Sequence, residues 1–380
     1  MPHYKFSDLA YNITDKKMPE PGDEKTYIGL EHLDSGSLAV TRWGGEIELK
    51  GQKLVMKKGD ILFGRRNTYL RRAAIAPHDG IFSAHGMIFR PKTEVIDPDY
   101  FPFFIASDYF MNAAIRISVG SLSPTVNWKT LKELEFDIPT LEEQRESAKI
   151  LKAANELKES YQVLLKKTDD LVKSQFIEMF GDPFENEKRL LIEPLSKHIE
   201  LLGGFAFKST GFVKEGIPVL RIGNINAGYF KPDDLPFWEY DEALDRYLLY
   251  PGDLVISLTG TVGKDDYGNV CRLGDDYPMY YLNQRNAKLI LKDTVLPEYI
   301  TALLKNRKVK DRIANAGVGV RQANISNKTI LELEVPVPEI EAQIQFASFV
   351  KQSDKSKFEL KQAIEGVDVL IKSLIQQELN

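Results

Sequence analysis

The chain has 380 residues, enough for two or three domains that each bury a core, and its 43 % apolar and 28 % charged residues are typical of a soluble globular protein. No run approaches the roughly 18 apolar residues of a membrane helix, and residues 1–10 lack the apolar run of a signal peptide, so we expect a cytoplasmic protein. The net charge of −5 and the single cysteine, Cys271, exclude a strongly basic chain, an intramolecular disulfide and a cysteine-rich zinc site.

Residues 1–139 are expected to form an α+β domain. Short β-rich runs, such as 60–63 and 87–89, are separated by glycine-containing turns. Four arginines within eight residues form either a solvated basic loop or a DNA-binding patch, because arginine can hold guanine through two hydrogen bonds. The candidate DNA contacts of this domain are Arg65, Arg66, Thr68, Tyr69, Arg71, Arg72 and His85.

Residues 140–182 are expected to form a long helix. Thr140 and Glu143 have the spacing of a capping box, and Gly181 followed by Pro183 is typical of a helix end. A helix of about 40 residues would be about 60 Å long, which suits a spacer between domains. Steps of four and three define a heptad seam at Ile150, Ala154, Leu157, Tyr161, Leu164, Thr168, Leu171 and Gln175.

Residues 183–337 are expected to form a second α+β domain, with strands near 253–257 and 287–291, a helical stretch over 299–314, and Cys271 as an ordinary strand residue. The run Gly260-Thr261-Val262-Gly263-Lys264 lacks the glycine spacing and the final Ser or Thr of a phosphate-binding loop, so a loop that contacts DNA is the better interpretation. The candidate DNA contacts are Lys208, Thr259, Thr261, Lys264, Asn283, Gln284, Arg285, Arg321, Gln322 and Asn324.

Residues 338–380 are expected to form a second long helix, and they complete an internal repeat. Shifting the chain by 199 residues aligns 119–144 with 318–343 without a gap, and ten of the 26 positions are identical. Shorter matches upstream have shifts of 193 (58–62 with 251–255) and 192 (33–36 with 225–228), as insertions in loops would produce. The seam positions recur at Phe349, Ser353, Ser356, Leu360, Ala363, Val367, Leu370 and Leu374, so we expect the two helices to bury their stripes against one another.

A search for catalytic residue patterns finds none that is convincing. The five histidines show no metal-ligand spacing, and the sequence contains neither a glycine-rich loop suited to S-adenosylmethionine nor the Asn-Pro-Pro-aromatic tetrapeptide of amino-methylating enzymes. Scattered Glu-x-Lys triplets arise freely among so many charged residues. A fused nuclease or methyltransferase is therefore disfavoured. A coiled-coil scaffold that binds only protein remains an alternative, because the chain is acidic.

The duplicated order of motifs resembles the specificity subunit of type I restriction-modification systems. The resemblance covers nearly the whole chain. It rests on residues 333–338 ending at Gln343 and 134–139 ending at Gln144, on Gly-Asp before a strand at 59–60 and 252–253, on the 259–263 loop, and on 282–285. The first copy departs from the pattern at Asp137, where the second has Pro336. It also has Gly64-Arg65-Arg66-Asn67-Thr68 in place of a glycine-threonine loop, which leaves its DNA contacts less defined.

The resemblance implies a non-catalytic subunit with a pseudo-two-fold internal repeat. Target-recognition domains at 1–139 and 183–337 would each read one half of a bipartite, asymmetric site in double-stranded DNA. Antiparallel coiled-coil helices at 140–182 and 338–380 would set the spacing of the half-sites and dock methyltransferase subunits, two in number. A restriction and translocation subunit would join the complex. S-adenosylmethionine, ATP and magnesium would belong to these partners, and no cofactor or metal to this chain.

Overall fold

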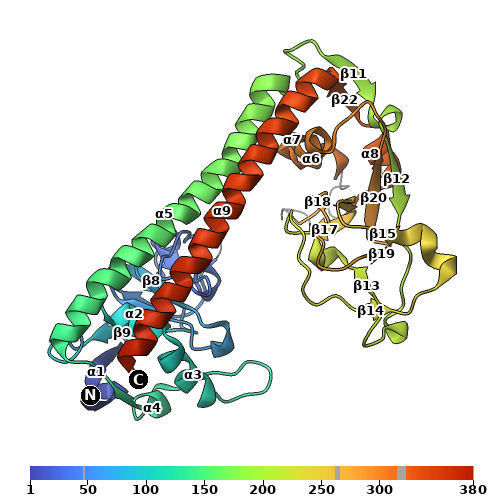
Figure 1. Ribbon diagram of the computed structural model, residues 1–380. Coiled ribbons are helices and arrows are strands. Elements are labelled where there is room, and N and C mark those ends of the chain that lie inside the picture. The colour runs from blue at the N-terminus through green and yellow to red at the C-terminus, as the bar shows by residue number, and fades with distance from the viewer. Residues whose placement is uncertain (46–47, 262–265, 315–321, 380) are drawn as a thin grey trace. The chain divides into compact units, whose positions relative to one another are not determined.

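A computed structural model describes residues 1–45, 48–261, 266–314 and 322–379 (Figure 1). The chain forms two compact units, Met1–Leu164 with Leu360–Asn380, and Leu165–Glu359. Each unit contains one globular domain and parts of two long helices, α5 (Leu141–Phe180) and α9 (Ile340–Leu379). None of the helices among the described residues combines the length and apolar character needed to cross a membrane.

The domain of the first unit, domain 1, is built on two four-stranded sheets. One has the order β2-β9-β6-β7, all antiparallel (Ala10–Ile13, Met87–Pro91, Ile61–Phe63, Ala73–Ile75). The other has the order β3-β5-β8-β4, with β4 parallel to β8 (Lys16–Lys17, Lys53–Met56, Gly80–Phe82, Tyr27–Ile28). Strands β1 (His3–Lys5) and β10 (Glu135–Asp137) pair at the entrance to α5.

Short helices cover the first of these sheets and complete an aromatic core. They are α1 (Phe6–Leu9), α2 (Phe101–Ala106), α3 (Asp108–Arg116) and α4 (Trp128–Leu131). Phe6 lies at the centre, with its ring 5.0–5.7 Å from those of Phe89, Phe110 and Trp128. Ala148 and Leu151 of α5 and Ile375 of α9 belong to the same core, so both long helices are anchored to the domain by apolar packing.

The domain of the second unit, domain 2, repeats this plan. The sheet β12-β20-β16-β18 is again wholly antiparallel (Ile199–Gly203, Asn286–Leu291, Leu254–Ser257, Val270–Arg272). The other sheet, β14-β13-β19-β15, again contains one parallel pair, β13 with β19 (Phe237–Trp238, Ile217–Leu220, Tyr280–Leu282, Leu248–Leu249). Strands β11 (Leu191–Pro194) and β22 (Glu334–Val337) pair before α9, as β1 and β10 pair before α5.

The helices of domain 2 are α6 (Pro297–Lys305), α7 (Arg307–Ile313) and α8 (Asn327–Leu331). The sequence pattern predicted one continuous helical stretch over 299–314, and this was wrong. Asn306 interrupts it in an extended conformation, and its side chain accepts a hydrogen bond from the backbone N–H of Lys308 and so caps a new helix. Asparagine favours such caps because its side chain competes for backbone hydrogen bonds.

The ends of α5 form as the sequence predicts. The backbone N–H of Thr140 donates to Glu143 Oε2 at 2.8 Å, and the N–H of Glu143 donates to Thr140 Oγ1 at 3.4 Å. Gly181 has φ +76° and donates its N–H to Ile177 O, which ends the helix with a left-handed residue.

In α5 the predicted heptad seam is half right. One half of the predicted positions is buried or partly buried: Ala154, Tyr161, Thr168 and Gln175. The other half is 44–54 % exposed: Ile150, Leu157, Leu164 and Leu171. The covered positions that alternate with the first set lie one residue later, at Leu151, Lys158, Leu165 and Val172. In α9 the prediction holds better: six of the eight predicted positions are at least partly buried, and only Ser356 and Leu370 are exposed, each followed by a partly buried residue, Lys357 or Ile371. A search for apolar residues could not identify this register, because Lys158 and Lys357 occupy inner positions of the seam.

Within each unit, the parts of α5 and α9 run side by side and antiparallel (Figure 1). Lys158 pairs with Asp368 at 2.6 Å in the first unit, and Lys357 pairs with Asp169 at 3.2 Å in the second. These two ion pairs are equivalent under the repeat, because 158 + 199 = 357 and 169 + 199 = 368. The register of the helix contacts is therefore duplicated along with the domains.

Candidate nucleic-acid interface

The candidate residues of domain 1 lie at one end of its antiparallel sheet. Phe63, the last residue of β6, pairs with Ala73 of β7 and with Met87 of β9. The β6–β7 loop, residues 64–72, and the β8–β9 turn, residues 83–86, therefore leave the sheet beside each other. These two segments contain all seven residues that the sequence singled out in this domain.

Three of the seven side chains are exposed at this end: Arg66, Tyr69 and His85. Arg66 donates to Ser123 Oγ at 3.3 Å, and its backbone forms an antiparallel bridge with Thr125. The backbone N–H of His85 donates to Ser83 Oγ, which fixes the turn and leaves the imidazole outside it. A cation, a phenol and an imidazole are thus available to an incoming ligand.

The side chains of Arg71 and Arg72 are held by protein groups, and Arg65 is held through its backbone. Arg71 pairs with Asp108 and also donates to Asn112. Arg72 donates to Leu30 O at 2.9 Å, and burial lowers the pKa of its guanidinium. Arg65 is half-buried and its carbonyl accepts from Val126 N–H at 3.0 Å. These residues shape the loop, while Arg66 and Tyr69 are displayed by it.

The structure corrects the interpretation of Thr68 as a DNA contact. Its side chain is 1 % exposed, and its hydroxyl donates to Arg65 O at 2.8 Å within the turn. A short polar residue next to a left-handed residue, here Asn67 with φ +53°, commonly bonds its own loop in this way. Thr68 therefore stabilises the loop conformation and does not face outward.

The same end of the equivalent sheet gathers the candidates of domain 2. Ser257, the last residue of β16, pairs with Asn286, the first residue of β20. Beyond them, Leu258 N–H donates to Arg285 O at 2.9 Å, and Asn283 forms a parallel bridge with Phe205. Strand β17 (Thr259–Thr261) pairs with β21 (Gln322–Asn324) at the same place.

Four segments far apart in the sequence therefore meet at this end: 205–208, 259–261, 283–285 and 322–324. Lys208, Thr261, Gln284, Arg285 and Asn324 are exposed there, and Thr259 and Asn283 are half-buried. Gln322 is placed by its backbone, which pairs with Thr261. Lys264 and Arg321 lie outside the described residues.

The two domains place different side chains at equivalent positions. The bridge between Arg66 and Thr125 corresponds to the pair of Thr259 with Asn324, because 66 + 193 = 259 and 125 + 199 = 324. The hydrogen bond from Val126 N–H to Arg65 O likewise recurs from Ile325 N–H to Leu258 O.

Sequence reasoning missed Ser123 and Thr125, which lie beside Arg66. The offset of the repeat could have found Thr125, because Asn324 was already a candidate.

Cys271 lies apart from this interface. It is a buried residue of β18, as the sequence predicted, and burial raises the pKa of its thiol to about 11. Among residues 1–45, 48–261, 266–314 and 322–379, no three His, Cys, Asp or Glu side chains are arranged to hold a metal ion.

A mixed α/β domain followed by a 40-residue helix is present twice, so the chain is a duplicated protein. The family described as Type I restriction modification DNA specificity domain matches residues 12–164 and 202–366, and the chain belongs to this family. The resemblance inferred from the sequence motifs is thereby confirmed, and DNA sequence recognition is the function that the family carries.

Curated relatives and solved structures agree with this assignment. The Type I restriction enzyme MjaVIII specificity subunit of Methanocaldococcus jannaschii is 22 % identical, over 92 % of this chain and 85 % of the relative. The EcoKI specificity subunit of Escherichia coli K12 is 25 % identical, over 79 % of this chain and 68 % of the relative. The S subunit from M. genitalium has a similar fold, with a TM-score of 0.51 at 14 % identity over 100 % of this chain and 96 % of that one.

Proposed function

We propose that each domain reads one half of a bipartite, asymmetric DNA site, and that catalysis belongs to partner subunits. The observation that supports this proposal is the equivalent sheet end of the two domains, which carries different side chains in each. Domain 1 displays Arg66, Tyr69 and His85, whereas domain 2 displays hydroxyl, amide and arginine groups. Arginine discriminates guanine and amides discriminate adenine, so the two surfaces suit different base sequences.

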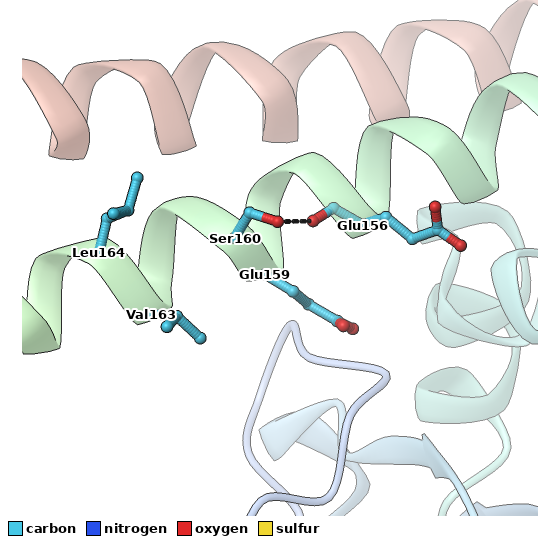
Figure 2. Close-up of a pocket in the computed structure, with 5 residues that line it drawn as sticks. All are labelled: Glu156, Glu159, Ser160, Val163 and Leu164. Carbon is cyan, nitrogen blue, oxygen red and sulfur yellow. Dashed lines mark hydrogen bonds between the residues drawn. The ribbon is translucent and has the colours of Figure 1, made fainter.

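The long helices are proposed to set the half-site spacing and to dock two methyltransferase subunits. Ile150, Leu157 and Leu164 form an exposed apolar stripe on α5 in the first unit. A shallow depression beside it is lined by Glu156, Glu159, Ser160, Val163 and Leu164. Figure 2 shows Glu159 and Val163 on the side of α5 that faces away from α9, and Leu164 on the side toward α9. Exposed apolar stripes with a polar rim suit a protein partner.

Those partners are proposed to contribute the chemistry. In this scheme the methyltransferase subunits bind S-adenosylmethionine, and a restriction and translocation subunit uses ATP and magnesium. The acidic net charge of this chain fits a shared DNA interface, because partner subunits can supply the cations that neutralise phosphates.

We expect substitutions in the two domains to change different half-sites. Gln284→Ala should weaken discrimination by about tenfold at one base of one half-site, because an amide pair with a base is worth about 1–3 kcal/mol. Arg66→Ala should do the same at the other half-site. The measurement is sequencing of methylated positions in host DNA after co-expression with the methyltransferase subunits.

A uniform loss over specific and random DNA would identify the substituted residue as a phosphate contact. The absence of any sequence-selective methylation by the wild-type complex would contradict the proposed function and favour a scaffold that binds only protein. Glu146→Gln, on the exposed surface of α5, is the matched control and should change neither half-site.

We expect the helices to determine the spacer. Inserting one heptad after Val163 and another after Gln362 preserves the register of both helices and lengthens each by about 10 Å. The spacer should grow by at most about three base pairs, at about 3.4 Å per base pair, while both half-sites keep their sequences. A methylated motif with an unchanged spacer would refute this role.

A further inference from the structure

Lys158 joins the long helices to the segment of domain 1 that contains Gly36. Its side chain is nearly covered, with the whole residue 8 % exposed. The ammonium group pairs with Asp368 of α9 at 2.6 Å and donates to Gly36 O of domain 1 at 2.9 Å. One cation therefore joins α5, α9 and a loop of the globular domain.

The segment that carries Gly36 is bonded in turn to the β6–β7 loop. Ser35 Oγ donates to Leu70 O, and Arg72 donates to Leu30 O at 2.9 Å. Residues 30–36 thus hold the far side of the loop that displays Arg66 and Tyr69. Polar contacts and the backbone of residues 30–36 together link Asp368, through Lys158, to Leu70 and Arg72 of the β6–β7 loop.

Domain 2 lacks this direct connection among the residues that the structure describes. Lys357, the equivalent of Lys158, pairs with Asp169 and Asp354 on the helices. The carbonyl of Gly228, equivalent to Gly36 because 36 + 192 = 228, instead accepts from Lys305 of α6 at 2.8 Å. The segment of domain 2 that contains Gly228 is therefore held by Lys305 of the same domain.

We propose that Lys158 is a positioning residue for DNA recognition, which fixes the β6–β7 loop of domain 1 relative to the helices. Lys357, in contrast, makes its ion pairs with Asp169 and Asp354 of the helices, and within the part of the chain that the structure describes it donates no hydrogen bond to the 225–228 segment. This inference rests on the proposed reading of one half-site by each domain. It predicts that equivalent substitutions in the two copies have unequal effects on specificity.

The test compares Lys158→Met with Lys357→Met in the full complex with the methyltransferase subunits, and the probe is host genomic DNA. We call the half-site read by domain 1 the first half-site. It is identified as the half-site that changes with Arg66→Ala and does not change with Gln284→Ala. With Lys158→Met, methylation of sites with one mismatch in the first half-site should rise about tenfold relative to matched sites, because one charged hydrogen bond is lost. The second half-site should be unchanged.

Lys357→Met removes an equivalent ion pair and should leave both half-sites intact. Asp368→Asn retains the hydrogen bond from Lys158 to Gly36 O, so it should also leave the sequences of both half-sites unchanged. If Lys158→Met prevents assembly, Lys158→Gln, which has a shorter reach, is measured instead. The inference would be overturned if the Lys158 variant discriminated against mismatches in the first half-site as well as the wild type does. It would also be overturned if Lys357→Met weakened discrimination at the second half-site by the same factor. A wild-type motif without two half-sites would refute the proposed function itself.

Discussion

Replacement of Phe346 with alanine is expected to destabilise the second unit by about 4 kcal/mol, the usual cost of removing a buried phenylalanine ring. Phe346 of α9 is 0 % exposed. Its ring lies 5.7 Å from that of Phe176 and 5.5 Å from that of Phe180, both on α5. Because these rings join the two helices to the core of domain 2, little can move to fill the cavity. The midpoint of thermal unfolding should fall by about 10 °C.

Phe358→Ala is the matched control on the same helix, because Phe358 is 61 % exposed and its loss creates no cavity. We expect a change of less than about 0.5 kcal/mol. Differential scanning calorimetry of the full chain measures both variants. Similar midpoints for the two would show that the aromatic cluster does not stabilise the unit.

Gln144→Leu is expected to cost about 3 kcal/mol, because it leaves three backbone groups without their partner in a buried place. Gln144 Oε1 accepts from Asp97 N–H at 2.7 Å. Its amide nitrogen donates to Val95 O at 3.2 Å and to Pro139 O at 2.8 Å. This side chain therefore fastens the first turn of α5 to the segment that leads into α2.

Gln343→Leu should have the same effect in the second unit, because Gln343 makes the equivalent three bonds, to Leu296, Thr294 and Pro338. Glu142→Gln at an exposed position of the same helical turn serves as the control. Chemical denaturation followed by fluorescence gives the free energies. A loss below about 1 kcal/mol for either glutamine would contradict the role assigned to it.

The duplicated features of the fold could be predicted where local chemistry determines them. The capping box at Thr140 and the end at Gly181 follow from residue types with strong backbone preferences. Gln144 and Gln343 stood out as identical residues in the repeat, but their bonds became evident only in three dimensions. The break at Asn306 could not be predicted from an apolar pattern, because a side-chain cap and a helical turn compete with similar energies.

The candidate site was harder to predict than the fold. Residue type alone marks Arg66 and Gln284 as candidates, because their side chains can form hydrogen bonds with base edges. It could not separate Arg66 from Arg71 and Arg72, because tertiary partners such as Asp108 decide which guanidinium groups are engaged. The seam shows the same effect. Lys158 is polar in the sequence, yet its position is covered, and Leu157 beside it is exposed.

The pairing of positions 66 and 125 in domain 1 recurs at positions 259 and 324 in domain 2, and this bears on how specificity can change. Both domains anchor the segments that carry the candidate contacts through backbone hydrogen bonds at equivalent positions, and these bonds do not depend on the side chains that the segments carry. New side chains can therefore be substituted without rebuilding the support beneath them. If each domain reads one half-site, as proposed, exchanging one of these short segments is expected to change the target of that domain and to leave the target of the other domain unchanged.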